Sequence, residues 1–194
     1  MRFIAKNTTI PIPKVLDVEE TPGGADKAWP EMDAAHKSTT AQELAGYVNQ
    51  LRSLRGDYIG AADRGKAVIG NSVHHEGGPF EDEDQFNQFL FSKILPNVPS
   101  ALRCFATGAF TNNHSIVFAH GDLSPSNILV DGQGHITGLI DWENAGWYPE
   151  YWEHARAYQD FNAVPGWSAY LSLILPPQYA SEIVALSYLS KISR

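Results

Sequence analysis

The sequence predicts an α+β fold that is mostly helical and contains one small β hairpin. Apolar residues recur at helical spacing over residues 39–55 and again over 81–95, which predicts two amphipathic helices. Residues 115–120 and 127–141 instead carry short apolar runs typical of strands, and the second region folds back at the turn residues 131–134. With 43% hydrophobic residues in a chain of 194, there is enough apolar surface for one core.

The elements before the hairpin follow from local patterns. Pro11 and Pro13 favour extended backbone, and a short strand is expected directly after them. Gly56 is expected to end the first long helix. The segment 60–78 is polar and rich in glycine, which predicts a long loop. Four acids at 81–84 favour the start of the second helix, because they lie at the positive end of its dipole.

The elements after the hairpin are predicted to be helical. Pro149 favours the first turn of a helix that continues to about residue 160. Two more helices are expected in the tail, separated by Pro176 and Pro177. Cys104, the only cysteine, lies in an apolar stretch between the second helix and the first strand, so we expect a buried and unreactive thiol.

Charge and hydropathy exclude several classes of partner. The net charge is −8 and no cluster of Lys and Arg occurs, so we expect neither a nucleic-acid partner nor an anionic membrane surface. No apolar run approaches the ~20 residues of a membrane-spanning helix. The start "MRFIAKNTT" lacks the apolar core of a signal peptide. We therefore expect a soluble cytoplasmic protein.

Three polar residues lie at the ends of the predicted strands. Asp122 follows the first strand, Asn127 comes five residues later, and Asp141 ends the last strand of the hairpin. Since a hairpin places the ends of neighbouring strands side by side, the three side chains are expected to face one small space. Two carboxylates and an amide oxygen suit a hard cation, and magnesium is the expected ion. An acid that does not bind the metal can accept a proton from a hydroxyl.

This arrangement resembles the kinase catalytic loop, H-x-D-x-x-x-x-N, followed by a metal-binding Asp on the next strand. The segments "HGDLSPSNILVD" and "ITGLIDWENAGWYPEYWEHARAY" resemble the aminoglycoside phosphotransferase and choline kinase-like family in its fungal form. The stretches "IAKNTTIPIPKVLDV" and "LAGYVNQLRSLRGDYIG" are also similar to that family, so the resemblance covers nearly the whole chain. It implies a protein-kinase-like fold.

The resemblance also implies a role for each residue of the loop. Asp122 would be the catalytic base that orients and deprotonates a substrate hydroxyl, and His120 would support the catalytic loop through hydrogen bonds. Asn127 and Asp141 would hold magnesium. Ser124, together with Asn127, would lie next to the phosphates of the cofactor. The implied substrate is a small molecule with a free hydroxyl.

Three residues after Asp141 are weaker candidates for contact with the substrate. Glu143 could contact the substrate or a metal-bound water. Trp147 and Tyr151 belong to an aromatic cluster that begins directly after Asp141, and they could line a substrate pocket. The alternative for these aromatic rings is ordinary helix packing, which we favour for any single ring.

The part of the family fold that binds ATP has no counterpart in this sequence. No glycine-rich phosphate loop, strand lysine or hinge segment is present, so residues 1–28 are interpreted as a remnant of the N-lobe and its connection. Residues 29–194 would form the C-lobe. Efficient use of ATP by the monomer is therefore not expected. Apolar surface without its usual cover would favour a homodimer that replaces the missing lobe.

Three functions remain open at this point. The first is a phosphotransferase that acts on a small-molecule hydroxyl. The second is a repurposed, nucleotide-independent acid/base catalyst that cyclises, isomerises or dehydrates a natural-product-like substrate. The third is a non-catalytic pseudokinase remnant. Dependence on nucleotide distinguishes the first two, and loss of turnover in Asp122→Asn distinguishes both from the third.

Overall fold

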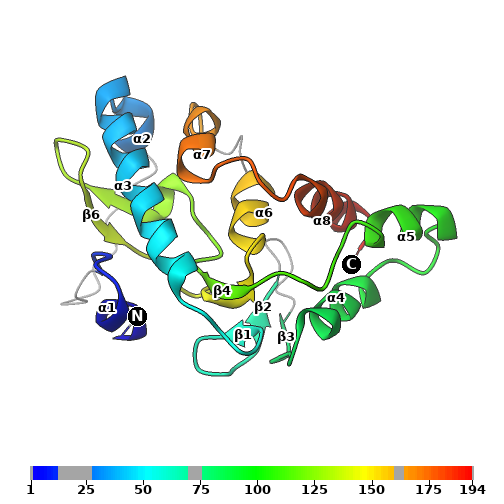
Figure 1. Ribbon diagram of the computed structural model, residues 1–194. Helices are drawn as coiled ribbons and strands as arrows, with labels where there is room; N and C mark the ends of the chain where they lie inside the picture. Colours follow the sequence, from blue (N-terminus) through cyan, green and yellow to red (C-terminus); the bar gives the residue numbers. More distant parts are fainter. Residues whose placement is uncertain (1, 13–27, 70–75, 160–163, 194) are drawn as a thin grey trace.

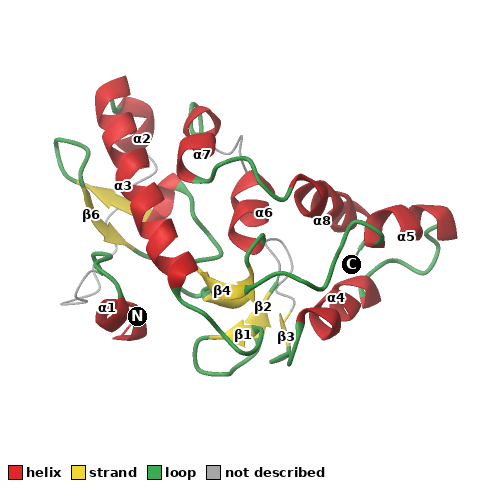
Figure 2. Ribbon diagram, viewed as in Figure 1, coloured by secondary structure: helices red, strands yellow, loops and turns green. Residues whose placement is uncertain are grey.

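The computed structural model describes residues 2–12, 28–69, 76–159 and 164–193, and its secondary structure alternates helices with three small antiparallel sheets (Figure 1; Figure 2). The helices are α1 (Arg2–Asn7), α2 (Ala28–Glu31), α3 (Ala34–Ser53), α4 (Glu83–Ser92), α5 (Ser100–Thr107), α6 (Trp152–Gln159), α7 (Ser168–Ile174) and α8 (Ala180–Ile192). The strands are β1 (Gly60–Ala61), β2 (Ala67–Val68), β3 (Glu76–Gly77), β4 (Ile116–Ala119), β5 (Ile128–Val130), β6 (Ile136–Leu139) and β7 (Gly146–Pro149). The predicted mixed, mainly helical fold is confirmed.

Two of the sheets carry the segments of interest. In the first, β7 lies between β1 and β4 and is antiparallel to both, with Ala119 opposite Gly146. In the second, β5 and β6 form the predicted hairpin, with Ile128 opposite Leu139. The turn of this hairpin is closed by the amide of Gly134, which donates to the carbonyl oxygen of Asp131. The expected turn residues are thus correct.

The longest helix, α3, begins five residues earlier than expected. Its N-cap is Asp33, whose carboxylate accepts a hydrogen bond from the amide of His36 at 2.8 Å. The predicted apolar stripe is confirmed, since Leu44, Val48 and Leu51 are all buried. This stripe packs against β4 and α7, so α3 connects the first sheet to the C-terminal helices.

The second predicted helix, α4, is confirmed with shorter bounds, while α5 was not predicted. Asp82 caps α4 by accepting from the amide of Gln85 at 2.9 Å. Pro99 stands at the N-cap of α5, where a proline is tolerated. Cys104 lies on α5 and is exposed, so the prediction of a buried thiol is wrong.

Two further predictions are corrected by strand pairing. Pro149 is the last residue of β7 and does not start a helix; α6 begins at Trp152. The pairing of β7 with β1 and β4 outweighs the preference of proline for a first helical turn. A proline at the end of a strand removes few of the hydrogen bonds between strands. The segment 60–78 contains β1, β2 and β3 rather than an uninterrupted loop.

The N-terminal residues pack on the same core as the rest of the chain. Ile4 and Ile10 are buried and belong to the cluster that contains Leu44 and Leu51 of α3. The carbonyl oxygen of Pro11 accepts a hydrogen bond from the amide of Leu139 on β6. The division into units 1–28 and 29–194 stays a prediction, and the strand expected after Pro13 lies outside the described residues.

No helix in the described part of the chain is both long and apolar enough to cross a membrane.

Candidate active site

The predicted polar residues converge where β4, β5 and β6 meet their loops. His120, Gly121 and Asp122 follow β4 directly, Asn127 ends the short 3-10 helix η2 (Pro125–Asn127), and Asp141 lies two residues after β6. The two sheets thus supply one loop each. That the three side chains form one site stays a prediction.

The contact between Asn127 and Asp122 is direct. Nδ2 of Asn127 donates to Oδ2 of Asp122 and to the main-chain oxygen of Asp122, both at 2.9 Å. Asn127 is buried and Asp122 is half-buried. Because both amide hydrogens are used, the side-chain orientation of Asn127 is fixed, and its Oδ1 receives no hydrogen bond from the described residues. The amide oxygen therefore remains available to a cation.

His120 is fully buried and links the two loops as a neutral imidazole. Its Nε2 lies 2.9 Å from the carbonyl oxygen of Ile140, which can only accept, so Nε2 carries the proton. Its Nδ1 then accepts from the amide of Asp122 at 3.3 Å. Burial lowers the pKa of His120, while the bond to Ile140 and the charges of Asp122 and Asp141 oppose this effect. The ring thus holds Asp122 and the residue before Asp141 in a fixed relation.

Two buried charged residues of α6, Glu153 and Arg156, bind the backbone of the loop that carries Asp122, and the sequence analysis did not identify them. Oε2 of Glu153 accepts from the amide of His120 at 2.5 Å, and Oε1 accepts from the amide of Gly121 at 3.1 Å. Nε of Arg156 donates to the carbonyl oxygen of Gly121 at 3.1 Å. Burial raises the pKa of Glu153 to about 7, against the opposing effects of these amides and of Arg156.

A signal for this pair exists in the sequence "YWEHARAY". It places an acid and a base three residues apart on one helical face, among aromatic and alanine residues. Both side chains are buried in the structure, with 4% of Glu153 and 9% of Arg156 exposed. Charged residues inside an otherwise apolar helix require buried partners, and the backbone after β4 supplies them as amides for Glu153 and a carbonyl oxygen for Arg156.

The backbone of both loops adopts the left-handed region at one residue each. Gly121 has φ of 79°, and a Cβ atom built there would lie 2.7 Å from the carbonyl oxygen of Asn144. Asp141 has φ of 58°, a conformation that Asp tolerates better than most residues. Asp122 and Asp141 both lie near enough to His120 for their charges to act on its ring.

Helix α3 fixes the hairpin that carries Asn127 and leads to Asp141. Oε1 of Glu43 lies 2.6 Å from Nδ1 of His135, and Oε2 accepts from the amide of Ile136 at 2.8 Å. Oγ1 of Thr40 donates to the carbonyl oxygen of Gly134 at 2.7 Å. The bond to Glu43 raises the pKa of His135. The turn of the hairpin is thereby attached to the core at three points.

The donor set suits a magnesium ion that is shared with phosphate. Oδ1 of Asn127 and the exposed carboxylate of Asp141 provide two oxygen ligands from adjacent loops. Magnesium bound with phosphates takes only one or two protein carboxylates and keeps several waters. Within the described ranges there is no group of three or more His, Cys, Asp or Glu residues that could form an all-protein metal cage.

The remaining predicted residues divide between surface and core. Oγ of Ser124, the residue before η2, lies 2.5 Å from Oγ of Ser126 within η2, and Glu143 is exposed. Trp147 packs edge-on against Phe118, with 5.0 Å between ring centroids. Tyr151 is completely buried. Both rings therefore have packing roles, and their predicted contact with a substrate gains no support from this arrangement.

The profile of the phosphotransferase enzyme family, APH, matches residues 1–173 of the sequence. The chain belongs to this family. The match includes the catalytic loop, the hairpin, α6 and all but one residue of α7. No curated protein matches the sequence.

Solved structures of aminoglycoside phosphotransferases share the fold of this family member. The wild-type aminoglycoside 2'-phosphotransferase-IIIa in its GDP complex superposes with a TM-score of 0.59 at 13% identity, over 98% of this chain and 70% of that one. A thermostable mutant of APH(4)-Ia in a ternary complex with AMP-PNP and hygromycin B gives a TM-score of 0.61 at 16% identity, over 98% and 72%. At such identities the likeness establishes the kinase-like fold, as predicted.

Proposed function

We propose that this protein transfers a phosphoryl group to the hydroxyl of a small molecule, with Asp122 as the base. The observation that carries the proposal is the double hydrogen bond from Nδ2 of Asn127 to Asp122. It holds the base beside an amide whose oxygen is free for a metal. Membership of the phosphotransferase enzyme family supports the same reaction class.

Asp122 would act through the carboxylate oxygen that Asn127 does not bind. Oδ2 accepts from Asn127, whereas Oδ1 receives no hydrogen bond from the described part of the chain. A substrate hydroxyl that donates to Oδ1 would be oriented by it and would lose its proton to it as the phosphoryl group is transferred. The neutral ring of His120 and the carboxyl of Glu153 would keep the loop in place during this step.

Asn127 and Asp141 would hold magnesium together with the phosphates of the donor. When bound, the ion would neutralise the charge that develops on the transferred group. Ser124, in the loop just before Asn127, would lie beside the same phosphates. The protein supplies positioning and charge stabilisation, on which phosphoryl transfer mainly depends.

A nucleotide is the proposed donor, although weak binding is expected. Some of the solved relatives are complexes with GDP or AMP-PNP, and one of these also contains hygromycin B. These relatives support a nucleotide donor and a small-molecule acceptor. The nucleotide would be held chiefly through its metal-bound phosphates. Fast turnover with ATP by this chain alone is not expected.

The test is a phosphoryl-transfer assay with labelled ATP and GTP, magnesium, and a panel of aminoglycosides and other polyhydroxylated small molecules. We expect slow transfer that falls at least about a hundredfold in Asp122→Asn, because the base is lost while the shape is kept. The matched control is Asp57→Asn, an exposed surface acid, which should keep the wild-type rate. Folded protein with no Asp122-dependent transfer would contradict the proposal. It would favour a nucleotide-independent catalyst or a non-catalytic remnant.

A further inference from the structure

The end of the molecule formed by α5 and α8 carries an open apolar groove. Its volume is about 690 Å³. Seven residues line it: Phe105, Ala109, Ala180, Ser181, Val184, Ala185 and Tyr188. In Figure 1 these two helices lie at the end of the molecule opposite the hairpin strand β6. The groove is thus separate from the catalytic loop.

The two most exposed large apolar side chains of the described residues both belong to this groove. Phe105 is 74% exposed and Val184 is 69% exposed, and Leu102 on α5 adds a further exposed side chain. Single exposed apolar residues are common, but an exposed aromatic ring and an exposed valine that line one hollow are not. Such a patch is typical of a surface that another molecule covers.

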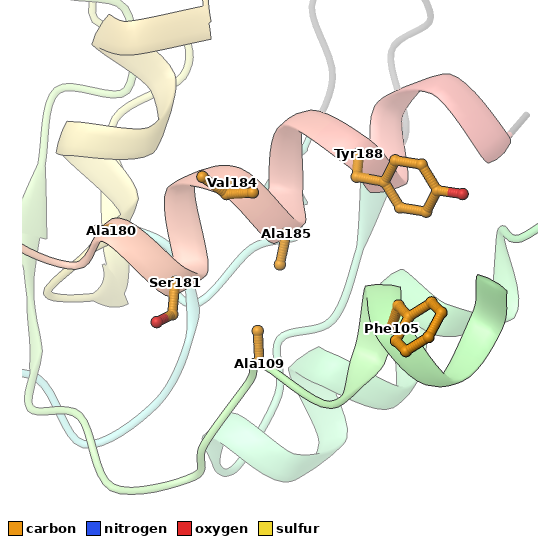
Figure 3. A pocket seen from close by; sticks show the side chains of 7 residues that line it. All are labelled: Phe105, Ala109, Ala180, Ser181, Val184, Ala185 and Tyr188. Carbon is orange, nitrogen blue, oxygen red and sulfur yellow. The ribbon is translucent and has the colours of Figure 1, made fainter. Parts of the chain in front are cut away.

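The groove combines a protruding ring with a hollow that has small side chains at its base. Figure 3 shows Ala109 and Ala185 facing each other across the groove, with Ser181 at one end and Phe105 and Tyr188 at the other. Alanine and serine leave room for a bulky side chain, and Phe105 is the side chain that protrudes beside them. The protruding ring of Phe105 and the hollow between Ala109 and Ala185 therefore lie next to each other on one face.

We propose that this face is where two copies of the chain associate about a twofold axis. In such an isologous contact each copy both gives and receives the same side chain. Phe105 of one copy would enter the hollow between Ala109 and Ala185 of the other, and the reverse contact would form at the same time. A partner without this pairing would fill the hollow but leave Phe105 exposed.

The uncharged lining of the groove permits contact between two acidic copies. The chain has a net charge of −8, so two copies repel each other over most of their surface. None of the seven residues that line the groove is charged. The two hydroxyl groups, those of Ser181 and Tyr188, can face water at the rim. An uncharged apolar face is where two acidic copies can approach with the smallest electrostatic cost.

Helix α5 buries little of its surface against the other described residues. Only Ala106 of α5 is buried, and it belongs to a small cluster with Ile94 and Leu189. A standard interface buries ~800 Å² on each side, so the groove would be the centre of the contact and the adjoining part of α5 its edge. The catalytic loop would stay open in this dimer, which therefore differs from a dimer that covers a missing N-terminal lobe.

The test is sedimentation velocity of the full chain over a wide range of concentration. Wild type should show a dimer that dissociates on dilution. Phe105→Asp and Val184→Asp should each weaken it by about tenfold or more, because a carboxylate would be buried without a partner. Both positions are highly exposed, so neither change should unfold the monomer. Leu173→Asp, at a position 44% exposed on α7, is the matched control and should dimerise like wild type.

The native thiol gives an independent readout. Cys104 is exposed on α5 and is the only cysteine, so a spin label attached there reports a distance between copies without any substitution. A dipolar signal present in wild type and lost in Phe105→Asp would support the proposal. A chain that is monomeric at every concentration, or a dimer unaffected by both Asp substitutions, would overturn it. A monomer whose groove binds an apolar dye would also overturn it and would assign the groove to a small ligand.

Discussion

The loop that carries Asp122 and the α5–α8 groove, two separate parts of the molecule, depart from ordinary burial in opposite ways. Around the loop, charged side chains are turned inward: only 4% of Glu153 is exposed. Around the groove, an aromatic side chain is turned outward: 74% of Phe105 is exposed. Inward charge is stabilised by loop amides, which suits a site that must hold a fixed geometry. Outward apolar surface is left without such a partner among the described residues, which suits contact with another molecule.

The largest effect expected is at the buried side of the loop. Glu153→Ala should lower the free energy of unfolding by about 2–4 kcal/mol, because the amides of His120 and Gly121 would be left buried without acceptors and Arg156 would lose its opposite charge. Urea denaturation measures this difference. Glu143→Ala removes an exposed acid and should change it by less than about 0.5 kcal/mol. Equal effects of the two substitutions would refute the role given to Glu153.

The backbone of the loop should be the next most sensitive feature. Gly121→Ala should cost about 1–3 kcal/mol, since the new Cβ would meet the carbonyl oxygen of Asn144 at a residue with φ of 79°. Gly132→Ala is the matched control, because no atom lies within 4 Å of a Cβ at that position. The same denaturation experiment applies. A Gly121→Ala variant as stable as Gly132→Ala would show that the turn can relax.

The pH dependence of stability should identify the buried carboxyl. Burial raises the pKa of Glu153 from 4.5 to about 7, so between these values the native state holds a proton that the unfolded state has released. Its contribution to stability is therefore complete below pH 4.5 and is lost as the pH rises through about 7. The free energy of unfolding of wild type should fall relative to Glu153→Gln over this window. Parallel curves for the two proteins would contradict the assignment.

A second buried group acts in the opposite direction at lower pH. Burial lowers the pKa of His154 from 6.5 to about 4. Its contribution is present above pH 6.5 and is lost as the pH falls through about 4. The contribution of His154 cancels in the comparison between wild type and Glu153→Gln, because both proteins retain His154.

The smallest effect is expected at the groove. Phe105→Ala should change the unfolding free energy of dilute, monomeric protein by less than about 0.5 kcal/mol, because most of the ring is already in contact with water. At high concentration the same substitution should lower the apparent stability, since it weakens the association of two copies. A loss above about 1.5 kcal/mol in the dilute protein would mean that the ring is packed within the monomer.

The sequence predicted the parts of the molecule that short-range patterns specify. The apolar runs around Asp122 and Asn127 and the turn at Asp131 identified the hairpin, because strand alternation and turn chemistry are local. The family resemblance then indicated the fold. The Asp82 cap of α4 was also visible as a run of acids before an apolar stripe.

Features that depend on distant partners were missed. Pro149 was given to a helix because its strand is defined by pairing with β4 and β1, and neither is its sequence neighbour. Glu153 was ignored because its partners are main-chain amides thirty-three and thirty-two residues away. Cys104 was expected in the core because an apolar sequence does not show that the helix turns such residues toward solvent.

The central claim is that the catalytic loop is a prearranged site for a metal-bound phosphate, and calorimetric titration of the full chain with magnesium and ATP tests it most directly. Asp141→Asn is the informative variant, since Asn also tolerates the φ of 58° and only the charge is removed. We predict weak, magnesium-dependent binding by wild type, reduced by about tenfold or more in Asp141→Asn and unchanged in Asp57→Asn. Nucleotide binding that does not depend on magnesium or on Asp141 would contradict the claim. The absence of binding by folded protein at millimolar nucleotide would also contradict it.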